Sequence, residues 1–352
     1  MSYKNIYILG VGGSGMSSIA KYLKQKGDNV IGYDQRKSYV TNLLNQDGIK
    51  VVHTLDEIIY TPESLYIYSS AIPIESENFQ DFYDKENVLS RPDYLKILSE
   101  DHKIIGITGT HGKTSTTALL SHIFHFNNLN VSYLYGGITT FNGIGGHYGD
   151  ADKPLILETD EAFNTFEKIN ISDLLVLNVD SDHLDYFKNL DNYKTAFYKV
   201  MKNVTDNLVV NNDDLNIKSM KELKNLVSYG TDISADFKVQ SSGIFIYENN
   251  KYEIKTDIIG DHFKSNMVGA IILALLNGIE ISDSLNAIES FAGVKRRIEL
   301  IGISKGVSIY DDYGHHPTEM EATITALKEQ TKSKLYVVFQ PHRYTRTKEY
   351  FN

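Results

Sequence analysis

The sequence contains no cysteine and no tryptophan among its 352 residues, and it has only 6 prolines. Without cysteine the chain can form no disulfide, has no thiolate nucleophile and offers no sulfur ligand for zinc or an iron–sulfur cluster. Long apolar runs are also missing, since the longest covers only residues 270–276, far short of the roughly 20 residues that cross a bilayer. No signal peptide precedes the first expected strand, so we expect a cytoplasmic protein without membrane insertion.

Basic residues are in the minority. The 35 Lys and Arg face 45 Asp and Glu, which gives a net charge of −10, and no long basic run is present. Proteins that bind nucleic acids need clustered positive charge, so we expect no nucleic-acid partner. The length predicts two or three domains of roughly 100–200 residues each. The sequence carries no signal for an oligomeric state.

The first part of the chain predicts a doubly wound parallel sheet. An apolar run at residues 6–9 is followed by a glycine cluster, an amphipathic stretch and a second apolar run at residues 29–33. The order strand, turn, helix, strand is typical of a βαβ unit. The same order restarts with an expected strand at 103–107 and a helix over 112–126. We therefore place a domain boundary near residue 99.

Two further features complete the predicted organisation of this α/β chain. Between about residues 235 and 258 the apolar period drops to two, which indicates a hairpin. A third unit begins near residue 294, with an expected strand at 307–310, a helix over 317–328 and a strand at 335–339. Because only 59 residues follow this point, we expect the third domain to be incomplete, as a fragment or a shortened form. The predicted domains cover residues 1–99, 100–293 and 294–352.

The first glycine cluster, Gly10-Val-Gly-Gly-Ser-Gly15, fits the pattern G-x-G-x-x-G and lies between an expected strand and helix. Glycines without Cβ atoms let a pyrophosphate approach the helix N-terminus. Asp34 follows about 20 residues later, where dinucleotide folds place the acid that binds a ribose hydroxyl. Alone, this pattern is typical of a nicotinamide dehydrogenase, or of a turn that serves only packing. We favour a nucleotide diphosphate as the ligand.

A second glycine turn, Gly109-Thr-His-Gly-Lys-Thr114, opens the helix of the central domain. It departs from the strict P-loop pattern because Ile107 stands where a glycine is expected. It keeps backbone N–H donors, a lysine for the β- and γ-phosphates and a hydroxyl for Mg²⁺. Two phosphate loops argue against a simple dehydrogenase. The first loop is expected to hold a nucleotide-linked substrate, and the second ATP.

Acidic clusters follow two expected strands of the central domain. Glu158-Thr-Asp-Glu161 comes after one, and Asp180-Ser-Asp-His-Leu-Asp185 after the other. The carboxyl ends of parallel strands meet at one edge of a sheet, so both clusters should converge on the Lys113 turn. An acid and a histidine there could each bind a Mg²⁺ ion that bridges the phosphates.

Six motifs together resemble the Mur ligase family, in family order from the first residues to the last. They are Gly-Val-Gly-Gly-Ser-Gly-Met-Ser at 10–17, Thr-Gly-Thr-His-Gly-Lys-Thr at 108–114, Asn-Val-Asp-Ser-Asp-His-Leu-Asp at 178–185, Gly-Val-Lys-Arg-Arg at 293–297, Asp-Asp-Tyr-Gly-His-His-Pro-Thr-Glu at 311–319 and Phe-Gln-Pro-His-Arg-Tyr-Thr-Arg-Thr at 339–347. The last two blocks are specific to the alanine-adding branch and its murein-peptide-recycling relative.

The resemblance implies a three-domain fold: an N-terminal Rossmann-like domain, a central P-loop-type ATPase domain and a C-terminal Rossmann-like domain. It implies an ATP- and Mg²⁺-dependent ligase that joins L-alanine to the lactyl carboxylate of UDP-N-acetylmuramate in peptidoglycan synthesis. The carboxylate would attack the γ-phosphate, and the amine of alanine would then attack the acyl phosphate. Two alternatives stay open: a recycling ligase that adds a peptide to the same sugar, and a truncated, non-catalytic form that only binds the UDP-sugar.

The resemblance also implies roles for individual residues. The UDP-sugar would contact Gly12, Gly13, Ser14, Asp34, Ser69, Ser70 and Arg91. ATP would contact Gly109, Thr110, His111, Gly112, Lys113, Thr114, Ser115, His262, Asn266, Arg297 and Asp312. The metal would be held by Thr114, Glu158 and His183. The amino acid would lie against Tyr313, His315, His342 and Arg343, and either histidine of that set could accept the ammonium proton. The residues expected to act in catalysis are Lys113, Glu158, His183, His315 and His342.

Two positions depart from the family pattern. Ala162 and Phe163 follow Glu161 where the family usually continues with Ser-Asp, which affects substrate contacts of that loop. Phe263 follows His262 where an asparagine is common, so we expect weaker polar contact with adenine.

Overall fold

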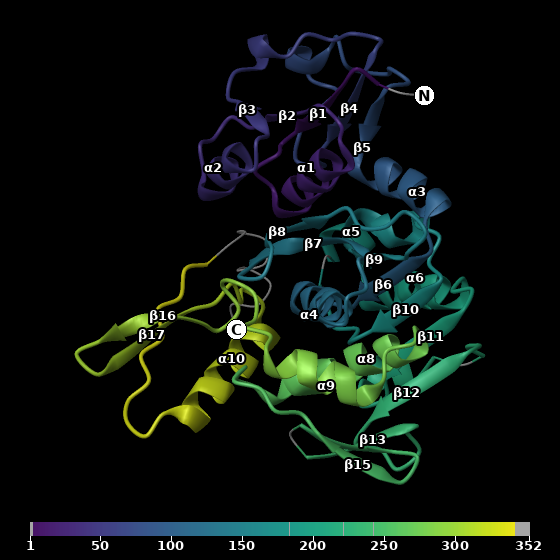
Figure 1. Cartoon of the computed structure of the whole chain (residues 1–352), viewed down its shortest axis with the longest axis vertical. Coiled ribbons are helices and arrows are strands. Elements are labelled where there is room, and N and C mark those ends of the chain that lie inside the picture. The colour runs from purple at the N-terminus through teal and green to yellow at the C-terminus, as the bar shows by residue number, and fades with distance from the viewer. Residues whose placement is uncertain (1–2, 183, 221, 242, 342–352) are drawn as a thin grey trace.

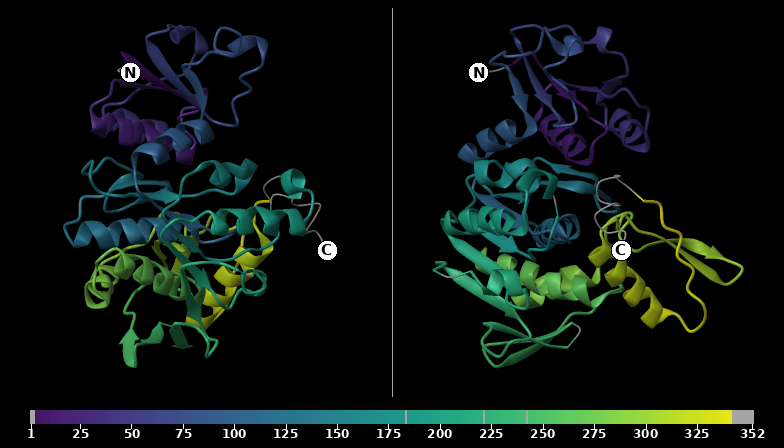
Figure 2. Two further views of the ribbon diagram at one scale, coloured as in Figure 1. Left: turned by 90° about the vertical axis from the view of Figure 1, so that its right-hand side faces the viewer. Right: turned by 180° about the vertical axis from the view of Figure 1, so that it is seen from behind.

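The computed structural model describes residues 3–341 with the exception of 183, 221 and 242. In this part of the chain the strands form a five-stranded, a ten-stranded and a two-stranded sheet. Figure 1 shows the N-terminal sheet above the central one, with the two-stranded sheet and α10 to one side. In both views of Figure 2 the N-terminal unit lies at one end of the molecule, and the yellow third region lies beside the central domain.

The N-terminal unit is a parallel sheet in the order β3-β2-β1-β4-β5. Its strands are β1 (Asn5–Leu9), β2 (Val30–Tyr33), β3 (Lys50–Val52), β4 (Ser64–Tyr68) and β5 (Val88–Ser90). Its helices are α1 (Ser14–Lys26), α2 (Tyr39–Gln46) and α3 (Arg91–Asp101), with short 3₁₀ turns at Leu55–Glu57 and Glu77–Phe79. The predicted βαβ order is confirmed, and α3 continues through residue 99, where we expected the first boundary.

Helix α1 has clear start and stop signals. Its capping residue Gly13 is extended, and it ends at Gly27, whose φ of 100° lies in the left-handed region that favours glycine. The N–H of Gly27 returns to the carbonyls of Leu23 and Lys24, which satisfies the last turn. At the other end, no side chain caps the helix, so its N-terminus is open toward the Gly10–Gly15 loop.

The central domain is built on a mixed sheet in the order β15-β14-β13-β12-β11-β10-β6-β9-β7-β8. Its strands are β6 (Ile104–Thr108), β7 (Ser132–Thr139), β8 (Gly143–His147), β9 (Leu155–Glu158), β10 (Asp173–Val176), β11 (Asn207–Asn211), β12 (Leu226–Gly230), β13 (Phe237–Ser241), β14 (Ile244–Tyr247) and β15 (Asn250–Glu253). Its helices are α4 (Lys113–Phe126), α5 (Leu184–Phe187), α6 (Leu190–Lys202), α7 (Leu215–Lys218), α8 (Asp261–Leu276) and α9 (Ile281–Glu289), with a 3₁₀ segment at Ala162–Lys168.

The middle strands of this sheet, β6, β9 and β10, run parallel and are almost wholly buried, as expected where helices cover both faces. Helices α4 and α8 pack together on one face, and both contribute to one hydrophobic cluster. The predicted hairpin is confirmed by the antiparallel strands β13, β14 and β15. Glu248 and Asn249 have positive φ there, as a tight two-residue turn requires.

The third region consists of an antiparallel hairpin and one helix. The hairpin joins β16 (Glu299–Ser304) to β17 (Val307–Asp311), and the helix is α10 (Pro317–Gln330). The strand that we predicted at residues 335–339 was wrong, because residues 332–341 have no regular secondary structure. A strand needs a neighbouring edge, and no third strand pairs with this hairpin among the described residues. The side chain of Val338 is accordingly 99% exposed.

The N-terminal unit packs on the central domain through α1 and the β7–β8 hairpin. Two glycines permit the close approach: a Cβ on Gly146 would lie 2.0 Å from the carbonyl oxygen of Ser18, and one on Gly136 would lie 3.0 Å from Ser14 Oγ. The buried Lys21 of α1 donates to the Ile144 carbonyl at 3.3 Å. This contact fixes the Gly10–Gly15 loop beside the central domain. No helix of the described chain is long and apolar enough to span a membrane.

Candidate active site

The turn between β6 and α4 forms an anion-binding cradle. Gly109 and Gly112 have φ values of 141° and 86°, and a Cβ on Gly112 would lie 2.5 Å from Asn266 Nδ2. Asn178 holds the turn with its side chain, which accepts from the His111 N–H at 2.8 Å and donates to the His111 carbonyl at 3.0 Å. The first turn of α4 carries no acidic residue. Its open backbone N–H groups and the helix dipole therefore favour a phosphate.

Lys113 is held inside this turn. Its ammonium donates to the carbonyls of Gly109 at 2.6 Å and Thr110 at 3.1 Å, and it pairs with the Glu161 carboxylate at 2.9 Å. Glu161 is 1% exposed and also accepts from the Tyr193 hydroxyl at 3.3 Å. Burial alone would lower the pKa of Lys113, but the charges of Glu161 and its neighbours outweigh burial and raise that pKa. The lysine is therefore charged.

Thr114 and Glu158 meet beside the lysine. The Thr114 hydroxyl donates to Glu158 Oε1 at 2.7 Å, and the N–H of Gly136 donates to Glu158 Oε2 at 2.6 Å. A hydroxyl and a carboxylate at the mouth of a phosphate-binding turn are the oxygen ligands that Mg²⁺ prefers, so these two residues fit that ion. His183, the third expected metal ligand, lies outside the described residues.

His111 connects the turn to the third region. Its Nε2 lies 3.4 Å from Asp180 Oδ2, and its Nδ1 lies 3.3 Å from Glu319 Oε1 in α10. Burial lowers the pKa of His111, but the hydrogen bonds to Asp180 and Glu319 outweigh burial and raise that pKa. His111, Asp180 and His316 each bring one possible ligand atom to within 4.8 Å of the others, the only such group in the part of the chain that the structure describes.

The loop before α10 carries the residues expected at the amino-acid site. Tyr313 and His315 line a cavity that Lys113 also lines, and the guanidinium of Arg297 lies 5.5 Å from the Tyr313 ring centre. Asp312 accepts from the backbone N–H groups of Ile298 at 2.8 Å and Gly314 at 2.7 Å, so its carboxylate organises this loop. His342 and Arg343 lie outside the described residues.

The residues expected to bind the UDP-sugar gather at the carboxyl ends of β1, β2, β4 and β5. Asp34 accepts from the N–H of Gly12 at 2.9 Å, so its carboxylate holds the glycine loop. Arg91 lies against Gly15, where an added Cβ would be 2.9 Å from the guanidinium carbon, and it reaches to 3.8 Å from Asp160 of the central domain. Arg91 therefore contacts both the first glycine turn and the loop that follows β9.

Side chains from all three regions line one cavity of about 610 Å³. Ser14 and Ser17 enter it from the N-terminal unit, Lys113, Thr114 and Glu158 from the central domain, and Arg297, Tyr313, His315 and Glu319 from the third region. The N-terminal and central glycine turns thus face the same space.

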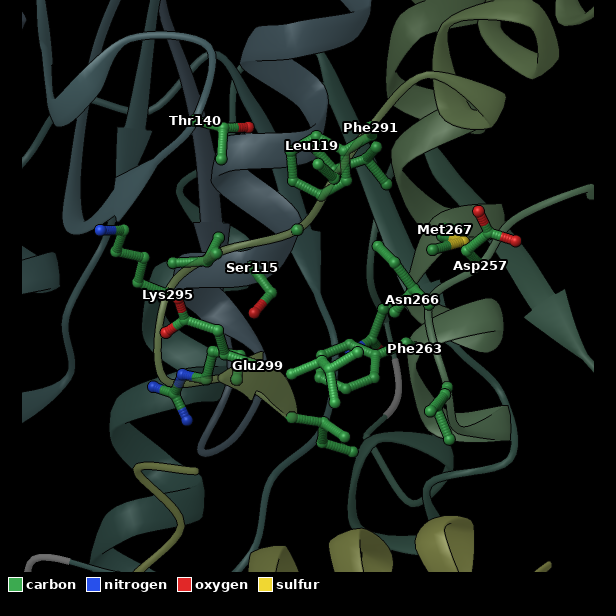
Figure 3. A pocket seen from close by; sticks show the side chains of 18 of the residues that line it. Ser115, Leu119, Thr140, Asp257, Phe263, Asn266, Met267, Phe291, Lys295 and Glu299 are labelled. Atoms are coloured by element: carbon green, nitrogen blue, oxygen red, sulfur yellow. The ribbon is translucent and has the colours of Figure 1, made fainter. Parts of the chain in front are cut away.

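A second cavity of about 590 Å³ lies next to the first, since Val294, Lys295 and Arg297 line both. Figure 3 shows Leu119 of α4 on one side of it and Phe263 and Asn266 of α8 on the other. Polar and apolar side chains both line it, and the apolar part around Leu119, Phe263 and Phe291 suits a planar heterocycle. His262 is not among its lining residues, and its ring packs on Phe263 with the ring centres 4.2 Å apart.

Sequence reasoning missed Glu161, Tyr193 and Glu319. Glu161 and Glu319 lie inside motifs that we quoted, so their position beside expected site residues was a usable signal. Tyr193 lies in α6, about 80 residues from the turn it contacts, and nothing local in the sequence marks it.

Three family models match the chain in order. They are the Mur ligase family catalytic domain over residues 5–101, the Mur ligase middle domain over 107–274 and the Mur ligase glutamate ligase domain over 296–351. Among solved structures, the UDP-N-acetylmuramate-alanine ligase of Thermotoga maritima matches with a TM-score of 0.82 and 26% identity, over 98% of this chain and 82% of that one. The UDP-N-acetylmuramate:L-alanyl-gamma-D-glutamyl-meso-diaminopimelate ligase of Neisseria meningitides shares the fold, with a TM-score of 0.72 and 21% identity over 84% and 100% of the two chains.

Curated relatives match at higher identity. The UDP-N-acetylmuramate–L-alanine ligase of Caldicellulosiruptor bescii is 35% identical over 98% of this chain and 79% of its own length. The enzyme of the same name from Hydrogenobaculum sp. is 36% identical over 98% of this chain and 80% of its own length. The predicted α/β, three-domain architecture is thereby confirmed, and the chain belongs to the Mur ligase family.

Proposed function

We propose that this chain is an ADP-forming ligase that uses ATP to join L-alanine to the lactyl carboxylate of UDP-N-acetylmuramate. The observation that supports the proposal is the shared cavity, which is lined by both glycine turns, by Lys113 and by the Tyr313–His315 loop. The relatives of that name, at 35% and 36% identity, support the choice of substrates. The reaction would belong to peptidoglycan synthesis in the cytoplasm.

Each substrate has a place that its chemistry suits. The UDP diphosphate would lie on the N-terminus of α1, with Asp34 behind the loop and Arg91 beside it. The base of ATP would enter the apolar cavity near Phe263, and its phosphates would lie on the turn that Lys113 closes. Thr114 and Glu158 would hold Mg²⁺, which neutralises phosphate charge when bound. The lactyl carboxylate would reach the cavity from the side of Ser14.

The first chemical step follows from this placement. A carboxylate oxygen of the sugar attacks the γ-phosphorus, the bond to the bridging oxygen breaks, and ADP leaves with the electron pair. The product is an acyl phosphate. Side chains supply position and charge rather than covalent chemistry, and Lys113 would supply positive charge at the phosphate turn.

Lys113 must change partners before it can serve the phosphates. Its ammonium has three N–H donors, and these already face the Gly109 carbonyl, the Thr110 carbonyl and Glu161. A bound triphosphate therefore replaces at least one of these contacts. Until then, the Glu161 carboxylate serves as the counter-ion of the lysine.

In the second step the amine of L-alanine attacks the acyl carbon. The tetrahedral intermediate collapses to the amide, inorganic phosphate leaves, and a base takes the ammonium proton. His315 is a candidate for this base, because its Nδ1 lies 2.9 Å from the Tyr313 carbonyl and so carries the proton of the neutral ring. The tautomer then has the basic lone pair on Nε2.

The test is release of phosphate from ATP in the presence of UDP-N-acetylmuramate and an amino acid. We expect release that depends on L-alanine and is much slower with a tripeptide as acceptor. Faster release with the tripeptide would instead select a recycling ligase. UDP-sugar binding without ATP binding, seen by calorimetry, would select a non-catalytic form. Binding of a nicotinamide nucleotide to the first glycine turn would contradict the assignment of that turn to the UDP-sugar.

A further inference from the structure

Glu319 lies in the first turn of α10, at the meeting point of three segments, and its side chain is 15% exposed. Its Oε1 is 3.3 Å from His111 Nδ1 in the phosphate turn and 3.7 Å from a guanidinium nitrogen of Arg297. Its Oε2 accepts from the backbone N–H of His315 at 3.2 Å. One carboxylate thus contacts both the nucleotide side and the amino-acid side of the cavity.

The charges of this cluster are complementary. The pKa of His111 is raised by Asp180 and Glu319 despite burial, and burial of Glu319 is outweighed by its hydrogen bond with His111 and by the charge of Arg297, which hold its pKa well below the usual range. Glu319 is therefore a partly buried anion that contacts the Arg297 guanidinium and the His111 ring, and charge-assisted contacts are stronger than neutral ones.

Polar contacts hold the first turn of α10. Further along the helix, Ala326 is buried and Met320, Ile324 and Leu327 are only half-buried. The first turn is held by Glu319, by the Thr318 hydroxyl, which donates to Asp180 Oδ2 at 2.7 Å, and by His316, whose Nε2 lies 3.1 Å from the Ser181 carbonyl. Loss of one polar contact should therefore loosen the helix and the loop before it.

We propose that Glu319 is a positioning residue that couples the nucleotide site to the amino-acid site. Its contact with His111 links it to the phosphate turn. Its hydrogen bond from the N–H of His315 holds the Tyr313–His315 loop at the cavity. The inference rests on the proposed function for its two ligands. Its consequence is that a nucleotide on the turn and an amino acid beneath the loop each strengthen binding of the other.

The kinetic test compares Glu319→Gln with Glu321→Gln, an exposed glutamate two residues further along the same helix. The first variant keeps the shape and removes the charge. We expect KM for L-alanine to rise about tenfold, the size of a lost charge-assisted contact, while KM for the UDP-sugar stays within about twofold. Glu321→Gln should match the wild-type protein. An equal rise of both KM values in Glu319→Gln would indicate a merely structural role and overturn the proposal.

A double-mutant cycle tests whether Glu319 acts through His111. If it does, His111→Gln and Glu319→Gln should each raise KM for L-alanine, and the double variant should be little worse than either single one. If the rise in KM of the double variant equals the product of the two single rises, the proposed coupling through His111 is overturned.

A structural measurement separates this inference from the ligase assignment. Hydrogen exchange of the α10 amides, in protein without substrates, should be faster in Glu319→Gln and His111→Gln than in the wild type, and unchanged in Glu321→Gln. An inactive wild-type protein with this exchange pattern would refute the proposed function and leave the attachment of α10 intact. Equal exchange in Glu319→Gln and Glu321→Gln would overturn the role of Glu319.

Discussion

The Nζ atom of Lys113 lies 2.9 Å from Glu161 Oε2, and the Glu161 side chain is only 1% exposed. The cation that would face the phosphates therefore has a buried counter-ion behind it. Removing either charge takes the counter-ion of the other away in a region with little access to water, where a charge without its counter-ion is costly.

Lys113→Met should abolish turnover and leave UDP-sugar binding nearly intact, because the two phosphate turns serve different ligands. The variant keeps the volume of the stem but removes the lysine counter-ion of Glu161, so it should lose about 3 kcal/mol of unfolding free energy. Chemical denaturation and UDP-sugar calorimetry measure the two effects. The double variant with Glu161→Gln should recover part of the lost stability while remaining inactive. Equal loss of UDP-sugar and ATP binding in Lys113→Met would contradict the separation of the two sites.

Thr114→Val should raise the Mg²⁺ concentration for half-maximal activity by about tenfold or more, because it removes one of the two oxygen ligands proposed for the ion. A Mg²⁺ titration at saturating ATP measures this. Thr117→Val is the matched control, since the Thr117 hydroxyl donates to the Lys113 carbonyl within the same helix. An unchanged Mg²⁺ requirement in Thr114→Val would remove this residue from the metal site.

Gly146→Ala should destabilise the protein by at least about 2 kcal/mol, because overpacking forces the backbone to move. The new Cβ would lie 2.0 Å from the Ser18 carbonyl oxygen and would push α1 away from the β7–β8 hairpin. Gly302→Ala is the control, since nothing lies within 4 Å of its added Cβ and its φ is not positive. Thermal unfolding of the two variants measures this difference. Equal unfolding midpoints would show that α1 does not pack tightly on the hairpin.

The stabilisation that His111 gives should depend on pH. Its pKa is raised in the folded protein, so its contribution is complete below the unfolded value of about 6.5 and is lost as pH rises through the folded value. Asp180 and Glu319 have lowered pKa values, so their contributions fade only in acid, while Lys113 and His316 repel the charged ring. The unfolding free energy of wild type minus that of His111→Gln should be largest at about pH 5–6.5 and shrink above that range. A difference independent of pH would mean that the ring acts without its charge.

The sequence was most informative where structure depends on neighbouring residues. The strand, glycine turn and helix around Gly12, and the same order around Gly112, follow from apolar periodicity and from φ values that only glycine adopts easily. The meeting of Glu158 with Thr114 follows from the rule that parallel strands end at one edge of a sheet.

Long-range and partner-dependent features were out of reach. The link between Tyr193 and Glu161 depends on how α6 packs on the turn, which no local pattern encodes. The segment at 335–339 has the composition of a strand but pairs with no other strand among the described residues, so propensity alone gave the wrong answer. Glu319 stood in a quoted motif, yet its contact with His111 crosses about 200 residues and needed the fold to be seen.

The most direct test of the proposed ligase activity is to identify the product of the complete reaction. The protein is incubated with ATP, Mg²⁺, UDP-N-acetylmuramate and L-alanine, and the nucleotide-sugar is analysed by mass spectrometry. We expect UDP-N-acetylmuramoyl-L-alanine together with one ADP and one phosphate for each amide formed, and no product with Lys113→Met. Unchanged UDP-N-acetylmuramate in the wild-type reaction, with ATP intact, would contradict the proposed activity.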